Sequence, residues 1–199
     1  NAVKYFTLAA EQGNPKAQSM LGYMHTKGEG VLQDYKNAIK WYTLAAEKGN
    51  QIAQFNLGNM YKKGEGTTQD YKNAIKWYTL AAEKGDAKSQ TNLGVMYANG
   101  EGVQQDYQVA HKWYSMAAEQ GNATAQFNLG FLYYNGQGVK QDYIKSHMWL
   151  NIAAMDGSNK NAIDARNLIA KKLTSTQIEI AQEFATRCVN KNYKNCEFE

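Results

Sequence analysis

The sequence predicts an all-α solenoid, a fold in which pairs of helices stack one after another around a continuous core. The first observation is a glycine motif that occupies residues 28–30, 64–66 and 100–102 as Gly-Glu-Gly and returns at 136–138 as Gly-Gln-Gly, a step of 36 residues. The second is that three further features keep this step. They are Trp41, Trp77, Trp113 and Trp149; Asp34, Asp70, Asp106 and Asp142; and Leu21-Gly22, Leu57-Gly58, Leu93-Gly94 and Leu129-Gly130. Self-similarity at such a period is the signature of stacked helix-turn-helix repeats.

The period divides the chain into a truncated repeat, four complete repeats and a C-terminal cap. Asn1-Ala2-Val3-Lys4 matches Asn37-Ala38-Ile39-Lys40, so the sequence is expected to begin in the middle of a repeat. We expect one continuous solenoid domain, with these parts: the second helix of a truncated repeat at 1–13, repeats at 14–49, 50–85, 86–121 and 122–157, and a helical cap and tail at 158–199.

The first helix of each repeat has its own start and stop signals. Asn14, Asn50, Asp86 and Asn122 precede these helices, and their side chains can accept hydrogen bonds from the amides of the first turn. Gly28 and its equivalents are expected to end the helix, because glycine adopts the left-handed conformation readily. Ala17, Leu21 and Met24 fall on one face of the helix, which is predicted to be buried.

The second helix of each repeat is specified in the same way. The repeated aspartates, Asp34 and its equivalents, are predicted to cap it, which explains them without a catalytic role. The glycines at 49, 85, 121 and 157 are expected to end it. Ala38, Tyr42, Ala45 and Ala46 gather on one face, and Gly22 and Ala45 are small enough for neighbouring helices to approach closely.

The repeat is lost after residue 157. Ala165-Arg166 stands where the Leu-Gly pair would recur, and residues 161–172 and 175–189 are predicted to be two amphipathic helices. The second opens on Thr174-Ser175-Thr176-Gln177, which has the pattern of a capping box. We expect these helices to form the polar cap that closes a solenoid.

Composition and charge exclude several classes of partner. The formal net charge is +4, but lysine supplies most of the positive charge, and Arg166 and Arg187 are the only arginines. Readers of nucleic acid rely on bidentate arginine, so we expect no nucleic-acid partner. No apolar run approaches the length of a membrane span, so we expect no membrane insertion.

The chain carries no recognisable catalytic motif. Nucleophile, zinc-protease and phosphate-loop patterns are all missing from the sequence. His111 and His147 share one repeat position, but no cysteine or carboxylate occupies that position in another repeat to complete a metal site. We therefore expect packing histidines, no catalytic residue, no metal and no cofactor, and we predict that the protein is not an enzyme.

Residues 53–85 carry the repeat most clearly. They contain Ala-Gln-Phe-Asn-Leu-Gly-Asn-Met-Tyr, Gly-Glu-Gly, Gln-Asp-Tyr, Ala-Ile-Lys-Trp-Tyr and Ala-Ala-Glu-Lys-Gly in order. This pattern resembles the Sel-one-like repeat (SLR) family, relatives of the tetratricopeptide solenoids, over residues 1 to about 157. The resemblance implies a curved, right-handed α/α superhelix whose first helices line a concave groove, and an adaptor or scaffold role. In bacteria such chains are often exported or engaged with a host.

A binding surface is predicted on the face of each first helix opposite its packed side. The resemblance turns this face toward the groove. The candidate partner-binding residues are Tyr23, Phe55, Asn56, Asn59, Asn92, Val95, Phe127, Asn128, Phe131 and Tyr134. Asn56, Asn92 and Asn128 recur one period apart and could hydrogen-bond the backbone of an extended peptide. The alternative is that these amides bond to a neighbouring helix and only fix the stacking.

The leading functional hypothesis is a scaffold or adaptor that binds a protein or peptide in the groove. The second is a carbohydrate or peptidoglycan-fragment binding module, because exposed aromatic rings at repeat spacing could stack on sugars. The third is a hydrolase acting on cell-wall material or β-lactams, which only a loose analogy supports. The sequence determines neither the identity of the partner nor the oligomeric state.

Cys188 and Cys196 are the only cysteines. We predict a disulfide between them, because their sulfurs can meet if the tail folds back, and closing this loop would stabilise the fold by about 2 to 3 kcal/mol. A disulfide would place the protein in the periplasm or outside the cell. Two unpaired thiols, and a cytoplasmic location, are the alternative.

Overall fold

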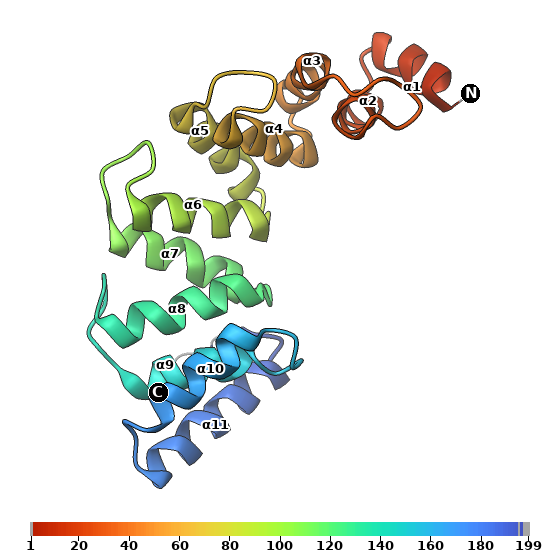
Figure 1. The fold of residues 1–199 in the computed structure, drawn as a ribbon. Helices are drawn as coiled ribbons and strands as arrows, with labels where there is room; N and C mark the ends of the chain where they lie inside the picture. Colours follow the sequence, from red (N-terminus) through yellow and green to blue (C-terminus); the bar gives the residue numbers. More distant parts are fainter. Residues whose placement is uncertain (1, 195, 197–199) are drawn as a thin grey trace. The chain divides into compact units, whose positions relative to one another are not determined.

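The computed structural model describes residues 2–194 and residue 196, and within them the secondary structure is entirely helical (Figure 1). The helices are α1 (Ala2–Glu11), α2 (Pro15–Lys27), α3 (Tyr35–Glu47), α4 (Gln51–Lys63), α5 (Tyr71–Ala82), α6 (Ala87–Asn99), α7 (Tyr107–Ala118), α8 (Ala123–Asn135), α9 (Tyr143–Ala153), α10 (Lys160–Ala170) and α11 (Ser175–Asn190). Helices that follow one another pack together, as α2 does with α3, α4 with α5, and α8 with α9. The predicted fold class, an α/α repeat solenoid, is confirmed.

The contacts divide the chain into two compact units. Unit 1 comprises residues 1–89 and contains α1 to α5 with the first residues of α6. Unit 2 comprises residues 90–199 and contains the rest of α6 with α7 to α11. The sequence-based division into one continuous domain stays a prediction.

The predicted helix caps are confirmed. The Asn14 and Asn50 side chains accept backbone amides of α2 and α4, and Asp34 caps α3 in the same way. At the other end of the first helix, Gly28 takes a left-handed conformation, with φ of 74°. Its amide donates to the carbonyl of Met24 at 2.8 Å. Because each repeat sets its own helix boundaries, neighbouring repeats have nearly the same length.

The predicted glycines close the second helices, although the last helical residues come slightly earlier. These residues are Glu47, Ala82, Ala118 and Ala153, and the glycines at 49, 85, 121 and 157 follow two to four residues later. In the first complete repeat, the Gly49 amide donates to Ala46 at 2.9 Å and the Asn50 amide donates to Ala45 at 3.0 Å. This pair of bonds is the Schellman motif, which closes a helix C-terminus with a glycine of positive φ, as predicted.

The core of unit 1 consists of small and large residues in alternation. Ala38, Ala45, Ala53 and Leu57 are fully buried, and the ring of Tyr42 is 1% exposed. Burial raises the pKa of the Tyr42 hydroxyl to about 12. The glycine of each Leu-Gly pair brings the first helix against the second, since a Cβ atom on Gly22 would lie 2.6 Å from the Tyr42 ring. The predicted packing faces are confirmed.

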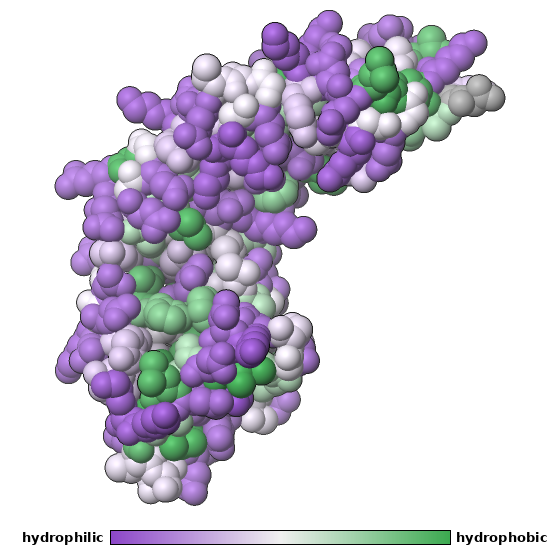
Figure 2. Space-filling view, in the orientation of Figure 1, coloured by the Kyte–Doolittle hydropathy of each residue, from purple (hydrophilic) through white to green (hydrophobic). Residues whose placement is uncertain are grey.

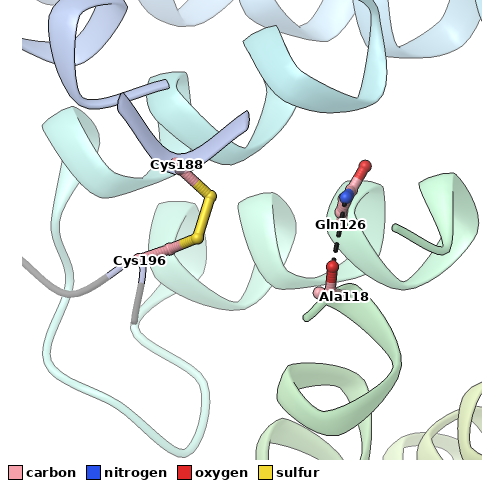
Figure 3. The surroundings of a disulfide bond; sticks show 4 residues. All are labelled: Ala118, Gln126, Cys188 and Cys196. Carbon is pink, nitrogen blue, oxygen red and sulfur yellow. Dashed lines mark hydrogen bonds between the residues drawn. A yellow bond between two sulfur atoms is a disulfide. The ribbon is translucent and has the colours of Figure 1, made fainter. Parts of the chain in front are cut away.

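A series of buried glutamines joins consecutive repeats, and the sequence analysis missed it. Gln54 is 3% exposed, and its Nε2 donates to the carbonyl of Ala46 at 3.0 Å, from the first helix of one repeat to the second helix of the preceding one. Gln18 bonds to Ala10 in the same way. In unit 2, Gln126 bonds to Ala118 at 3.2 Å (Figure 3). These bonds give a second donor to carbonyls at the ends of the second helices, which also accept the amide of the glycine in the closing turn.

The C-terminal cap forms the two predicted helices with small shifts of their ends. Asn159 caps α10, and the predicted capping box of α11 is present, with Thr174 and Gln177 bonded to each other's backbone amides. Both helices pack against α9. On the face shown in Figure 2, hydrophobic residues lie at the surface over α1 and over the cap helices. No helix in the described part of the chain is long and apolar enough to cross a membrane.

Candidate functional site

The main candidate site is a groove between α2 and α4, the first helices of two consecutive repeats in unit 1. It encloses about 430 Å³ and is lined by Lys16, Ser19, Met20, Tyr23, Asn50, Ile52 and Asn56. Met20 is 40% exposed, Tyr23 39% and Ile52 66%. We call this cavity the α2–α4 groove. Its wall is mainly apolar, and apolar side chains at the surface of a concave site are typical of binding sites.

A second, more polar cavity adjoins the groove. It encloses about 290 Å³ and shares Tyr23 and Asn56 with the α2–α4 groove. Its lining also includes Lys27, Lys63 and Glu65. The Tyr23 hydroxyl donates to the Glu29 carboxylate at 3.1 Å, and this hydrogen bond raises the pKa of Tyr23 above its usual value. The two cavities together form an apolar end and a charged end on one surface.

The predicted asparagines do not behave alike. Asn59 accepts a hydrogen bond from the buried Tyr78 hydroxyl at 2.7 Å, so its oxygen fixes the packing of α4 on α5. Asn56, Asn92 and Asn128 are half-buried, and none of their side chains is hydrogen-bonded to another described residue. Their amide groups therefore retain the donors and acceptors that the peptide-binding interpretation requires.

Phe55 and Val95 are less exposed than Met20, Tyr23 and Ile52 of the groove. Both are half-buried, and the Phe55 ring lies 6.2 Å from the Tyr78 ring. Ile52 was not among the predicted residues, although it lies on the predicted face of its helix. The sequence could have indicated Ile52 as a binding residue, because the same repeat position holds lysine in the neighbouring repeats, at Lys16 and Lys88.

In the fourth repeat, the cap covers part of the predicted surface. Phe127 packs against a buried cluster of Ala153, Ala154 and Ala162, which belongs to α9, the turn after it and α10. The Phe127 ring also lies 4.8 Å from that of Phe131, which stays 40% exposed. The Tyr134 ring lies 5.6 Å from that of Tyr143 in α9. Phe131 is therefore the most open of these aromatic side chains.

His111 and His147 have separate surroundings. The Nε2 atom of His111 lies 3.1 Å from the Tyr133 hydroxyl, whereas His147 is 2% exposed. Burial lowers the pKa of both imidazoles, with smaller contributions from Lys145 at His111 and Arg166 at His147. The described residues contain no group of three or more histidines, cysteines or carboxylates that could hold a metal ion.

The structure contains the predicted disulfide between Cys188 in α11 and Cys196 in the tail (Figure 3). Their Cα atoms are 4.9 Å apart, because the chain reverses direction after α11. Asn192 and Tyr193 have positive φ in this turn, and the Tyr193 amide donates to the Cys188 carbonyl at 2.9 Å. The Tyr193 ring lies against Gly121, where a Cβ atom would be 2.9 Å from it. The disulfide thus holds a turn that packs on the body of unit 2.

Titration of the native-source protein with a thiol reagent under denaturing conditions is expected to find no free thiol, because both cysteines are bonded. The same titration after reduction is the control and should find two thiols, the number of cysteines in the sequence. Two free thiols before reduction would contradict the pairing.

Comparison with known proteins agrees with this architecture. A sequence model of the Sel1 repeat matches residues 1–14, 15–50, 51–86, 87–122 and 123–158. The chain belongs to the Sel1 repeat family. Its four complete Sel1 repeats begin one residue after the boundaries predicted from the sequence. No curated protein is detectably similar to the chain.

Solved structures of Sel1 repeat proteins have the same fold. A Sel1 repeat protein from Oxalobacter formigenes is 40% identical, with a TM-score of 0.73 over 81% of this chain and 47% of that protein. A protective antigen of uropathogenic Escherichia coli with an SLR fold is 33% identical, with a TM-score of 0.59 over 98% of this chain and 49% of that protein. A Sel1 repeat protein from Klebsiella pneumoniae, 22% identical with a TM-score of 0.52, shares the fold. The chain spans about half the length of the first two proteins.

Proposed function

We propose that this chain is a protein-interaction scaffold that binds a partner polypeptide on the exposed face of its first helices. Sel1 repeats commonly serve as interaction scaffolds and are generally not catalytic. The observation that carries the proposal is the α2–α4 groove, where apolar side chains line a cavity of about 430 Å³ and remain open to solvent. Burying such side chains against a partner removes apolar surface from water and favours association.

The lining of the groove favours an extended segment that has an apolar side chain with acidic residues beside it. Met20 and Ile52 provide an apolar contact for one side chain of the partner. Lys16 lines the same cavity and Lys27 lines the adjoining one, where Lys63 is ion-paired with Glu65 at 3.5 Å. Positive charges around an apolar contact attract acidic residues and fix the register of the segment.

Asn56 lies at the boundary of both cavities. An amide side chain offers a donor and an acceptor, so it can hydrogen-bond the backbone of an extended segment whatever its sequence. This supports a polypeptide partner, since the repeated amide matches the repeated backbone of a peptide. In unit 2, Asn92 and Asn128 occupy the same repeat position and offer the same groups.

The disulfide supports a location outside the reducing cytoplasm. Disulfides persist in oxidising compartments, such as the periplasm and the extracellular space, and are rare in the cytosol. We place the protein in one of these compartments, and its partner is then a protein found there.

Hydrogen exchange on the complex with a protein captured by this chain tests the proposed surface. We expect slower exchange in α2 and α4 when the partner is bound, because their exposed face becomes covered. The second helices α3 and α5 serve as the internal control and should exchange as in the free chain. Protection confined to α3 and α5 would contradict the proposal.

A further inference from the structure

A larger cavity lies in unit 2, where α9 begins beside the turn that joins α10 to α11. It encloses about 570 Å³, and three lysines, Lys140, Lys145 and Lys172, line it. Asp142 is the acidic residue of the lining, and its carboxylate already accepts the backbone amides of Ile144 and Lys145 at 3.0 and 2.9 Å. The charge of the cavity is therefore positive. This cavity is separate from the α2–α4 groove, which belongs to unit 1.

Aromatic rings hold two of the lysines in place. The Lys172 ammonium lies 5.9 Å from the centre of the Tyr134 ring and 5.6 Å from that of Tyr143. The Lys145 ammonium lies 5.6 Å from the centre of the Tyr133 ring. A cation over a ring face is attracted by the ring, so these side chains lose less freedom when a ligand binds. The site is thus organised before any ligand arrives.

Two helices also begin at this cavity. Tyr143 is the first residue of α9, and Gln177 lies in the first turn of α11. Neither helix has an acidic residue in its first turn. The amides at both N-termini are already capped, by the Asp142 carboxylate at α9 and by Thr174 at α11, so the lysines supply the positive charge of the cavity.

The remaining lining shows which anion fits. Val139, Ile144 and Leu173 give the cavity an apolar part, which a bare phosphate ion would leave uncovered. Each of the two side-chain amides that could recognise a neutral sugar already uses one of its two groups in a hydrogen bond within the chain. Gln141 donates to the Tyr134 carbonyl at 2.8 Å, and Gln177 accepts the Thr174 amide at 2.9 Å. We propose that this cavity is a second binding site, which takes an acidic peptide segment whose carboxylates contact the lysines and whose aliphatic side chains contact the apolar lining.

The test is fluorescence anisotropy with a labelled peptide of alternating glutamate and leucine, titrated with the full chain at low salt. We expect binding that weakens as salt rises, because the attraction is electrostatic. Lys140→Gln and Lys172→Gln should each weaken binding about tenfold, as expected for loss of one charged contact. Lys171→Gln is the matched control, because Lys171 adjoins Lys172 in the chain but does not line the cavity. The control should bind like the wild type, and all three variants should keep its melting temperature.

Four results would overturn the proposal. The first is no binding of the glutamate-leucine peptide at low salt, and the second is equal binding of its glutamine-leucine counterpart. The third is displacement of the peptide by an equal concentration of inorganic phosphate, which would indicate a simple phosphate site. The fourth is complete loss of binding in Ile52→Asp, because the α2–α4 groove accepts the same class of peptide but this change should leave the present site intact. The fourth result would place the acidic peptide in unit 1, so it also separates this proposal from the proposed function.

Discussion

Replacing Gly58 by leucine is expected to lower the free energy of unfolding by about 1 to 3 kcal/mol, the usual cost of overfilling a packed core. A Cβ atom at this position would lie 2.7 Å from Cδ1 and Cε1 of Tyr78, and the Tyr78 ring is fully buried. The ring therefore has no room to withdraw. The effect opposes helix propensity, which favours leucine over glycine by less than about 1 kcal/mol. Gly94→Leu should lower the free energy of unfolding by a similar amount, because its Cβ atom would clash with the Tyr114 ring.

The free energy of unfolding, measured with denaturant for four proteins, distinguishes the clash with Tyr78 from an effect of the substitution on helix α4 alone. They are the wild type, Gly58→Ala, Tyr78→Ala and the double variant. Removal of the ring leaves space for the new methyl group, so Gly58→Ala should destabilise the wild type but not the Tyr78→Ala background. Equal destabilisation in both backgrounds would contradict the packing of α4 on α5.

The sequence could predict the fold because each repeat specifies its helices locally. Asp34 and Gly28 act on groups a few residues away, so their roles are visible without tertiary structure. The last helical residue of each second helix was less predictable. Gly85 closes the C-terminus of α5 with positive φ, but Glu83 and Lys84 lie between the helix and this glycine. The length of the closing turn depends on its hydrogen bonds, which the residue type alone does not reveal.

The buried glutamines and the fourth repeat depend on contacts between elements. Gln54 is polar, so its residue type suggests a surface position. It is nevertheless buried, because its side chain donates to the Ala46 carbonyl. The recurrence of a glutamine at this position in every complete repeat could have indicated its structural role. Phe127 lies on the predicted binding face, but the packing of the cap places Ala162 against it. The sequence predicted that a cap exists, whereas its docking position depends on the shapes of both surfaces.

Ile52→Asp is expected to weaken partner binding at least tenfold while leaving the fold stable. The Ile52 side chain is 66% exposed, so its replacement removes little buried surface, and surface substitutions usually change stability by less than about 0.5 kcal/mol. In the complex, an aspartate would be buried against an apolar side chain of the partner and would repel its acidic residues. A buried charge without a partner is costly, so the expected loss is large.

The affinity of the captured partner for Ile52→Asp tests the central claim most directly, with Leu32→Asp as its matched control. Leu32 is 90% exposed in the turn after α2 and does not line the α2–α4 groove, so its replacement adds the same charge to the same unit. We predict that Ile52→Asp binds at least tenfold more weakly than the wild type, that Leu32→Asp binds as the wild type does, and that all three unfold at the same temperature. Unchanged affinity of Ile52→Asp, or an equal loss in both variants, would contradict the assignment of this groove as the partner-binding surface.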